Sequence, residues 1–164
     1  MTRSLSNTFV TLLLLAVAGC GFHLRGSADL PANIKKMYIQ GADIKQDFGL
    51  ALKRALSANG VTVLTDYQQG SSVLTVLENK TERRVLSVGA DAKVSEYGLH
   101  GIVRFKVSDD KGQLILDEQS VEAQRDYQFN QDQVLASGNE ERALREQLNQ
   151  QLAQSVLRRL SVLK

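Results

Sequence analysis

Apolar residues fall at different spacings along this chain, and each spacing predicts a different element. The short apolar run Met37–Gln40 predicts a brief strand. Over residues 48–56 the apolar positions recur at intervals of three and four, which predicts a helix. We expect Asp47 to cap this helix and Gly60 to end it in the left-handed region. Val61–Leu64 then returns to the pattern of a strand.

A period of two runs through residues 72–129 and predicts an antiparallel meander with one buried face. Gly89 and the cluster Asp109–Gly112 mark its two reversals. Each predicted strand is about fifteen residues long, against the usual five or six, so the strands should extend beyond a small core. A second reversal centred on Asp110 and Lys111 predicts these cross-strand pairs: Val107 with Leu114, Phe105 with Leu116, and Val103 with Glu118.

The last segment, 139–164, has helical spacing and a broad apolar stripe. We expect Ser137 or Asn139 to cap this helix, with Glu140 and Glu141 in its first turn, where the helix dipole favours acids. The stripe recurs at every fourth position: Leu144, Leu148, Leu152, Val156 and Leu160.

Together these elements predict an α+β fold. It is a two-layer sandwich, in which two helices pack on one face of a mixed four- to five-stranded sheet with a long antiparallel meander. No element of the chain remains to cover the other sheet face. We therefore expect that face to meet either water or a partner molecule.

Residues 1–19 have the pattern of an export signal. Arg3 is the only charge before the uncharged run 9–18, which as a helix covers roughly half of a ~30 Å hydrocarbon core. The sequence Val17-Ala18-Gly19-Cys20 resembles the lipobox of bacterial lipoproteins. This resemblance implies cleavage before Cys20, whose thiol would carry a diacylglycerol group and whose amine would carry an acyl chain. Such chains anchor a protein stably in a membrane.

The residue after Cys20 is Gly21 and not aspartate, which by the lipoprotein sorting rule implies the outer membrane. Residues 20–31 then form a lipidated tether, and residues 32–164 form a single domain.

Composition narrows the class of function. The formal net charge of +2, the aromatic content of 5% and the absence of tryptophan argue against binding of nucleic acid. One cysteine excludes an intramolecular disulfide, and with only two histidines it argues against a metal site. His100 has no sequence neighbour that suggests a catalytic triad, and Asp109-Asp110 fits a hairpin turn. The chain is therefore predicted not to be an enzyme, and we expect no cofactor apart from the lipid.

The most suggestive polar residues are three cations near the first reversal of the meander: Arg83, Arg84 and Lys93. Arginine forks match phosphate oxygens, so such cations can hold a phosphorylated glycolipid. The neighbouring apolar residues, Val85, Leu86 and Val88, would then meet its acyl chains. The alternative is a solvated strand end with scattered charges.

The hexapeptide Cys20-Gly21-Phe22-His23-Leu24-Arg25 resembles the lipidated terminus of the LptE family of LPS-assembly lipoproteins. The order of predicted elements matches that family over nearly the whole mature chain, which begins at Cys20. The resemblance implies a protein without catalysis that sits in the outer-membrane barrel LptD as plug and assembly partner. It also implies binding of lipopolysaccharide and help with its insertion into the outer leaflet, from the periplasmic side or within the barrel lumen.

Two positions depart from the family pattern. Basic residues tied to glycolipid binding in the family are replaced here by Ala90 and Ser137, so Arg83, Arg84 and Lys93 are candidates to substitute for them. Two other functions stay open. One is a lipoprotein subunit of another envelope complex, such as the barrel-assembly complex. The other is a periplasmic module for a small anionic ligand, which would need a closed pocket in place of a shallow groove.

Overall fold

The computed structural model describes residue 30 and residues 34–130 and 134–163, which form a five-stranded sheet and two helices. The elements are β1 (Lys36–Gln40), α2 (Asp47–Ala58), β2 (Thr62–Leu64), β3 (Ser72–Val88), β4 (Val94–Ser108), β5 (Leu114–Gln128) and α3 (Val134–Leu160). The strand order is β2-β1-β3-β4-β5. Strand β1 is parallel to both neighbours, whereas β3, β4 and β5 pair antiparallel. The predicted α+β class with an antiparallel meander is confirmed.

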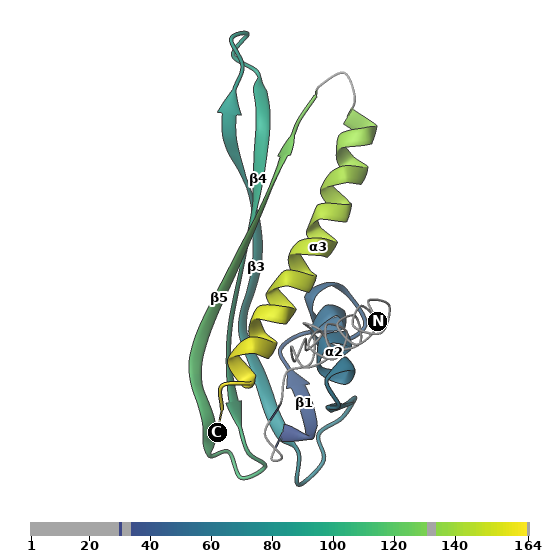
Figure 1. Ribbon diagram of the computed structural model, residues 1–164, viewed down its shortest axis with the longest axis vertical. Coiled ribbons are helices and arrows are strands. Elements are labelled where there is room, and N and C mark those ends of the chain that lie inside the picture. Colours follow the sequence, from purple (N-terminus) through teal and green to yellow (C-terminus); the bar gives the residue numbers. More distant parts are fainter. Residues whose placement is uncertain (1–29, 31–33, 131–133, 164) are drawn as a thin grey trace, which may run out of the picture.

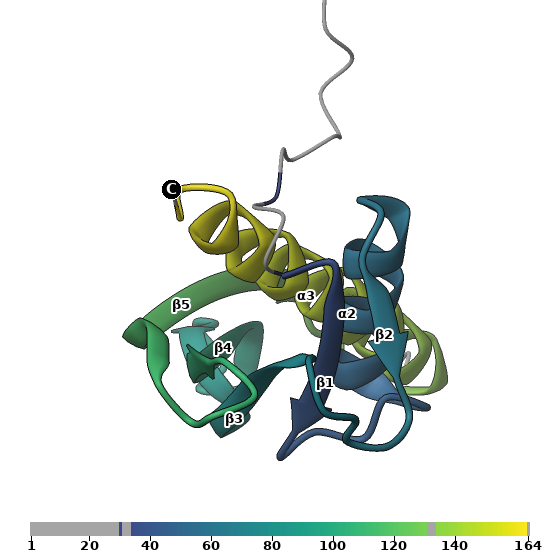
Figure 2. The same cartoon turned by 90° about the horizontal axis from the view of Figure 1, so that it is seen from below.

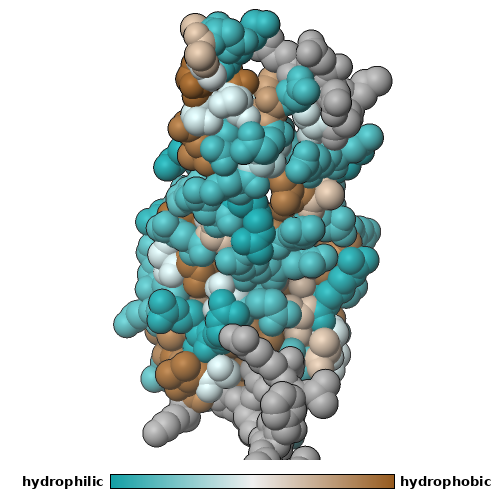
Figure 3. All heavy atoms as spheres, turned by 45° about the horizontal axis from the view of Figure 1, so that its top comes forward, coloured by the Kyte–Doolittle hydropathy of each residue, from teal (hydrophilic) through white to brown (hydrophobic). Residues whose placement is uncertain are grey.

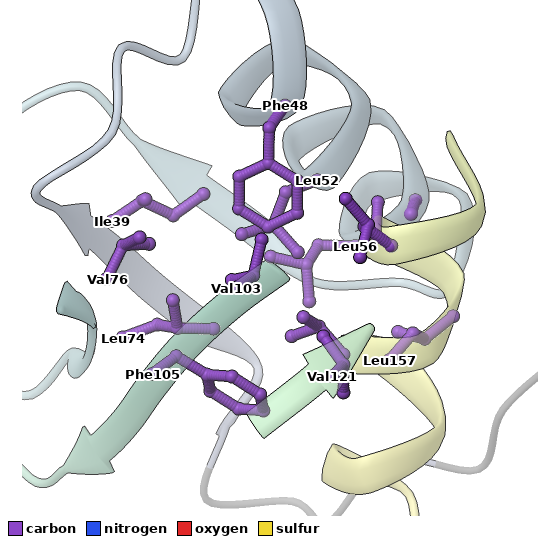
Figure 4. Close-up of a cluster of buried hydrophobic side chains, with 14 of the residues drawn as sticks. Ile39, Phe48, Leu52, Leu56, Leu74, Val76, Val103, Phe105, Val121 and Leu157 are labelled. Carbon is purple, nitrogen blue, oxygen red and sulfur yellow. The ribbon is translucent and has the colours of Figure 1, made fainter. Parts of the chain in front are cut away.

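Both helices cover the same face of the sheet (Figures 1 and 2). Their apolar sides and the inward side chains of the strands form one buried cluster. Figure 4 shows Phe48 of α2, Phe105 of β4 and Leu157 of α3 within it, all at most 2% exposed. Burying a side chain of this size contributes roughly 1.5–3 kcal/mol, so this cluster holds the two layers together.

The first helix ends as predicted but begins differently. Gly60 has a φ of 80° and follows the C-cap Asn59, which confirms the left-handed end. Asp47 does not cap the helix, because it is the first helical residue and has a φ of 46°. The N-cap is Gln46, whose side chain makes no capping bond. The preceding loop folds back so closely that a Cβ at Gly49 would lie 2.1 Å from the Asp43 carbonyl oxygen.

The meander has the predicted reversals and strand lengths, since β3, β4 and β5 are 17, 15 and 15 residues long. The predicted register is wrong. The observed pairs are Ser108 with Leu114, Val107 with Leu116, Phe105 with Gln119, and Val103 with Val121. Irregularities on both sides of Val107 shift the strands past one another. Apolar pairing therefore continues into the core at Val103 instead of weakening away from the turn.

The second helix begins at Val134 rather than at residue 139, and it ends at Leu160 rather than at residue 164. Ser137 is thus a buried residue inside the helix and not its cap, and no acidic residue lies in the first turn. The physical reason is that Gly138 does not break the helix. Glycine costs about 1 kcal/mol there relative to alanine, which a 27-residue helix packed on a sheet tolerates.

The meander extends beyond the helical layer at one end of the molecule (Figure 1). The buried apolar residues of β3 end at Val76, although the strand continues to Val88. In β4 the corresponding residues begin only at Leu99. We call residues 83–97, which form the end of the β3–β4 hairpin, the hairpin end.

Candidate functional site

The hairpin end closes in a tight turn at the predicted reversal. The Gly89 amide donates to the Lys93 carbonyl oxygen over 2.7 Å, and the Ala92 amide donates to the Gly89 carbonyl oxygen over 3.0 Å. Three large apolar side chains next to the turn are exposed: Val85 (52%), Leu86 (45%) and Val88 (55%). Figure 3 shows brown apolar surface at this end, and further brown areas lie elsewhere among the teal hydrophilic surface of the same face. Because successive strand residues alternate, Val85 and Leu86 point to opposite faces, so both faces of the hairpin end carry exposed apolar side chains.

Arg83 and Arg84 lie on opposite faces of the sheet, because successive strand residues alternate. Arg83 lies on the helix-covered face, where its Nη1 is 3.1 Å from Glu141 Oε2 of α3. Its guanidinium carbon also lies 4.5 Å from the centre of the Tyr97 ring, a cation–π contact. Arg84 lies on the other face, with its Nη2 2.9 Å from Glu82 Oε2. Each arginine therefore already has a carboxylate partner.

Lys93 lies in the turn itself, where its Nζ is 3.8 Å from Asp91 Oδ2. Arg83 pairs with Leu99, which is six residues along β4 from Lys93. At ~3.3 Å per residue the two cations are roughly 20 Å apart along the strand. The structure thus does not bring the three predicted binding residues into one cluster. Arg84 and Lys93 remain accessible at the hairpin end, and their role in glycolipid binding stays a prediction.

Glu141 organises a polar cluster that the sequence did not reveal. Its Oε2 accepts hydrogen bonds from the Tyr127 hydroxyl at 2.6 Å and from Arg83 at 3.1 Å. Its Oε1 accepts two from Arg145, at 3.0 Å from Nε and 2.7 Å from Nη2. The cluster thereby ties α3 to β5 and to β3 at the base of the hairpin end. Only the spacing of four residues between Glu141 and Arg145 could have been read from the sequence.

The cluster shifts the pKa values of its members. Burial raises the pKa of Glu141, but the hydrogen bonds from Tyr127, Arg145 and Arg83 outweigh it, so the net shift is downward. Burial, together with the hydrogen bond to Glu141, raises the pKa of Tyr127 to about 12. Glu141 is therefore charged and Tyr127 neutral at pH 7. An aromatic group packs beside them, with the Tyr97 ring centre 5.9 Å from Tyr127 and 5.1 Å from Phe129.

The sheet face opposite the helices, which we call the open face, is polar. Arg104 alternates with the buried Val103 and Phe105, so it points away from the helices. Its Nε is 2.8 Å from Glu78 Oε2 and its Nη1 is 3.0 Å from Glu118 Oε1. The expectation that no helix of this chain covers this face holds for the described residues (Figure 2).

The remaining candidate residues have structural partners. His100 lies on the open face, with its Nε2 3.3 Å from Glu122 Oε2. Asp109 Oδ1 accepts bonds from the Lys111 and Gln113 amides at 2.9 and 2.8 Å, which confirms the turn. Asp110 accepts from the Gly70 amide at 3.1 Å. The part of the chain that the structure describes contains no group of three or more histidine, cysteine or carboxylate side chains that could hold a metal ion.

Cys20, the signal segment 1–19 and nearly all of the predicted tether lie outside the described residues, as do residues 131–133. Within the described ranges, neither helix is long and apolar enough to cross a membrane.

The fold and these polar clusters define a two-layer α+β domain with an exposed hairpin end and a polar open face. Residues 34–160 match the sequence model of LptE, described as lipopolysaccharide-assembly. The chain therefore belongs to the LptE family, as its first residues after the lipobox suggested. This is a family of lipoproteins without enzymatic activity, which confirms the prediction that the chain is not an enzyme.

Individual relatives agree with this assignment. The LPS-assembly lipoprotein LptE of Photorhabdus laumondii is 28% identical over 160 residues, covering 98% of this chain and 87% of the relative. The LptE of Pectobacterium atrosepticum is 28% identical over 164 residues, covering 98% and 86%. A minor lipoprotein from Acinetobacter baumannii has a similar solved structure, with a TM-score of 0.67 and 30% identity over 80% of this chain and 94% of the other. Lipoprotein B from Nitrosomonas europaea has a TM-score of 0.68 and 26% identity, covering 86% and 90%.

Proposed function

We propose that this chain is a lipid-anchored outer-membrane protein of lipopolysaccharide assembly. In this proposal Cys20 carries the lipid, and the domain occupies an LptD-type barrel as plug and assembly partner. The match of the LptE sequence model to residues 34–160 carries the proposal, because it spans the whole folded domain. The charged open face supports it, since a surface with Arg104 between two carboxylates suits a water-filled lumen better than an apolar interface.

Purification of the full chain from detergent-solubilised envelope tests the partner. We expect one large barrel to be recovered with it in a one-to-one ratio. Recovery of a barrel-assembly complex, or of no membrane protein, would contradict the proposal. A Cys20→Ala variant tests the anchor. It should fold and remain in the soluble fraction without palmitate label, and label that persists in this variant would refute lipidation at Cys20.

Lipopolysaccharide binding is the second part of the proposal, with Arg83, Arg84 and Lys93 as candidate contacts at the hairpin end. Arg83 also supports the fold through Glu141, so its reversal would confuse binding with stability. The cleaner variant combines Arg84→Glu with Lys93→Glu, both at exposed positions. The matched control combines Lys106→Glu with Lys111→Glu, which make the same charge change at the other end of β4.

We expect the hairpin variant to retain less lipopolysaccharide in a pull-down than the control, with an unchanged circular dichroism spectrum. Equal retention by both variants would remove the hairpin end as a contact.

A further inference from the structure

An open groove of about 810 Å³ lies between α2 and α3. This volume is within the ~300–1,000 Å³ typical of ligand sites. Small and apolar residues form most of the α2 wall, among them Leu50, Ala51 and Ala55, and Asp47 and Arg54 also line it. The α3 wall carries five amide side chains between Gln147 and Gln154. The groove therefore has one apolar wall and one wall rich in hydrogen-bonding groups.

Four arginines from three elements line this groove together with Asp47 and Glu146, and among the described residues three of the four arginines have no ion pair. Arg145 is paired with Glu141. Within the described part of the chain, the Arg142 side chain donates to Asn139 Oδ1 at 3.2 Å, and the Arg125 side chain donates to the Gln124 carbonyl oxygen at 3.0 Å. For Arg54 of α2 the described part of the chain provides neither a hydrogen bond nor an ion pair. Such a group of arginines is suited to an anion, because each guanidinium can donate a pair of parallel hydrogen bonds to a phosphate group.

A second observation restricts the ligand. The amide oxygen of Gln151 is buried and has no hydrogen-bond partner among the described residues. An orphaned acceptor of this kind is costly, and because the oxygen has no exposed surface, a ligand relieves the cost only if the Gln151 amide turns toward the groove and meets a donor. A fully ionised phosphate group has no donor, whereas a sugar hydroxyl both donates and accepts, as the neighbouring amides do. The ligand thus needs hydroxyl groups as well as an anionic group.

We propose that the groove between α2 and α3 binds a phosphorylated saccharide. Its phosphate contacts Arg54, Arg125 and Arg142, its hydroxyls meet the amide row of α3, and its less polar ring surface lies on the alanines of α2. An acidic peptide would satisfy the arginines, but it offers one backbone donor per ~3.3 Å, fewer than the hydroxyls of a sugar ring. The assignment of this saccharide to the headgroup of lipopolysaccharide rests on the function proposed above.

The test uses the full chain in detergent and glucose 1-phosphate as the probe. The groove variant combines Arg54→Gln with Arg142→Gln, two exposed residues without an ion pair among the described residues. The control combines Lys53→Gln with Arg159→Gln, which remove the same charge from the same helices outside the groove. Binding is followed through the side-chain amide resonances of the α3 glutamines.

We expect glucose 1-phosphate to shift these resonances more than glucose or inorganic phosphate does. The groove variant should lose about tenfold in affinity or more, and the control less than about twofold. No shift, an equal shift with inorganic phosphate, or equal losses in both variants would overturn the proposal. Binding of an oligoglutamate peptide without binding of glucose 1-phosphate would also overturn it, in favour of a protein partner.

A pull-down with lipopolysaccharide separates this inference from the proposed function. Weaker retention of lipopolysaccharide by the groove variant than by its control supports the assignment to the headgroup. If wild-type protein binds lipopolysaccharide and the groove variant binds it equally well, the proposed function stands and the assignment falls. If wild-type protein does not bind it, the lipopolysaccharide part of the proposed function and the headgroup assignment fail together. The groove as a saccharide site is then decided by glucose 1-phosphate alone.

Discussion

The carboxylate of Glu141 joins three elements through single side chains. It receives hydrogen bonds from Tyr127 of β5, Arg83 of β3 and Arg145 of α3. Hydrogen bonds to a charged group contribute more than neutral ones, about 1.5–3 kcal/mol each when the charge is partly buried. The junction between α3 and the meander therefore depends on this one group.

We predict that Tyr127→Phe lowers the free energy of unfolding by about 1–2 kcal/mol at pH 7, because the charged carboxylate loses a donor. Urea denaturation measures this. Tyr38→Phe is the matched control, since the contact found for the Tyr38 side chain in the described chain is an edge-on one with the Tyr67 ring. Its free energy should change by less than about 0.5 kcal/mol. Equal effects of the two substitutions would show that the Tyr127 hydroxyl contributes nothing.

The pH dependence of Glu141 gives a second prediction. Its pKa is lower in the folded state than the ordinary value of 4.5, so the folded state favours the charged form. The resulting stabilisation is present above the unfolded pKa and is lost as the pH falls through the folded value. Glu141→Gln should therefore be less stable than wild type at pH 7, and the difference should shrink below about pH 4.5. Urea midpoints of both proteins from pH 7 to pH 3 measure it, and a constant difference would contradict the assignment.

The same cluster contains an ion pair, between Arg83 and Glu141, that could not be predicted from the sequence. Arg83 was expected to be a cation available for a phosphate group, because its neighbours in sequence are Arg84 and Val85. Its actual partner, Glu141, lies 58 residues further along the chain. A pairing of such separation depends on how far β3 extends beneath α3, which local spacing does not encode.

At the scale of elements, α3 lies unusually close to β4 at Gly101. A Cβ at this position would lie 2.9 Å from Leu152 Cδ1 and 3.0 Å from Leu148 Cδ2. Glycine thus allows the leucines of the helix to rest directly on the strand. We predict that Gly101→Ala destabilises the protein by about 1–3 kcal/mol through overpacking, as measured by urea denaturation.

Gly138→Ala is the matched substitution for this prediction. It lies within α3, where an added Cβ meets nothing within 4 Å. It should stabilise the protein by about 0.5–1 kcal/mol, because alanine loses less backbone entropy in a helix. A neutral Gly101→Ala would mean that the two leucines move aside at no cost, and the contact between α3 and β4 would then be loose.

The elements themselves followed from periodicity, and their boundaries and pairing did not. The period of two gave the meander, and the four-residue spacing from Leu144 to Leu160 gave α3. The irregularities around Val107 change which residues of β4 and β5 pair. They have no sequence signal of their own, because the apolar and polar residues on either side still alternate. The sequence does not predict the start of α3, because serine and glycine at 137–138 are typical of helix ends. In the structure both residues lie inside a longer helix.

At the scale of the whole molecule, the apolar core and the meander have different lengths. The sequence predicts the strand lengths, and these lengths imply that the strands extend beyond the core. The exposed Val85, Leu86 and Val88 occupy that extension. Backbone hydrogen bonds there lack a covering layer, so they should open without unfolding of the rest.

Native-state hydrogen exchange tests this difference along one strand. Amides of Val94–Glu96 should exchange by local opening. Those of Leu99–Val107 should exchange only by global unfolding, because alternate side chains of this segment are mostly buried in the core. We expect the second group to exchange at least about tenfold more slowly, which corresponds to a difference of ~1.4 kcal/mol in opening free energy. Uniform protection along β4 would mean that the hairpin end is part of the same cooperative unit as the core.

If the hairpin end contacts the barrel or glycolipid, binding should slow exchange at Val94–Glu96 and leave Leu99–Val107 unchanged. Exchange measured with and without the proposed barrel partner therefore tests this contact without any substitution.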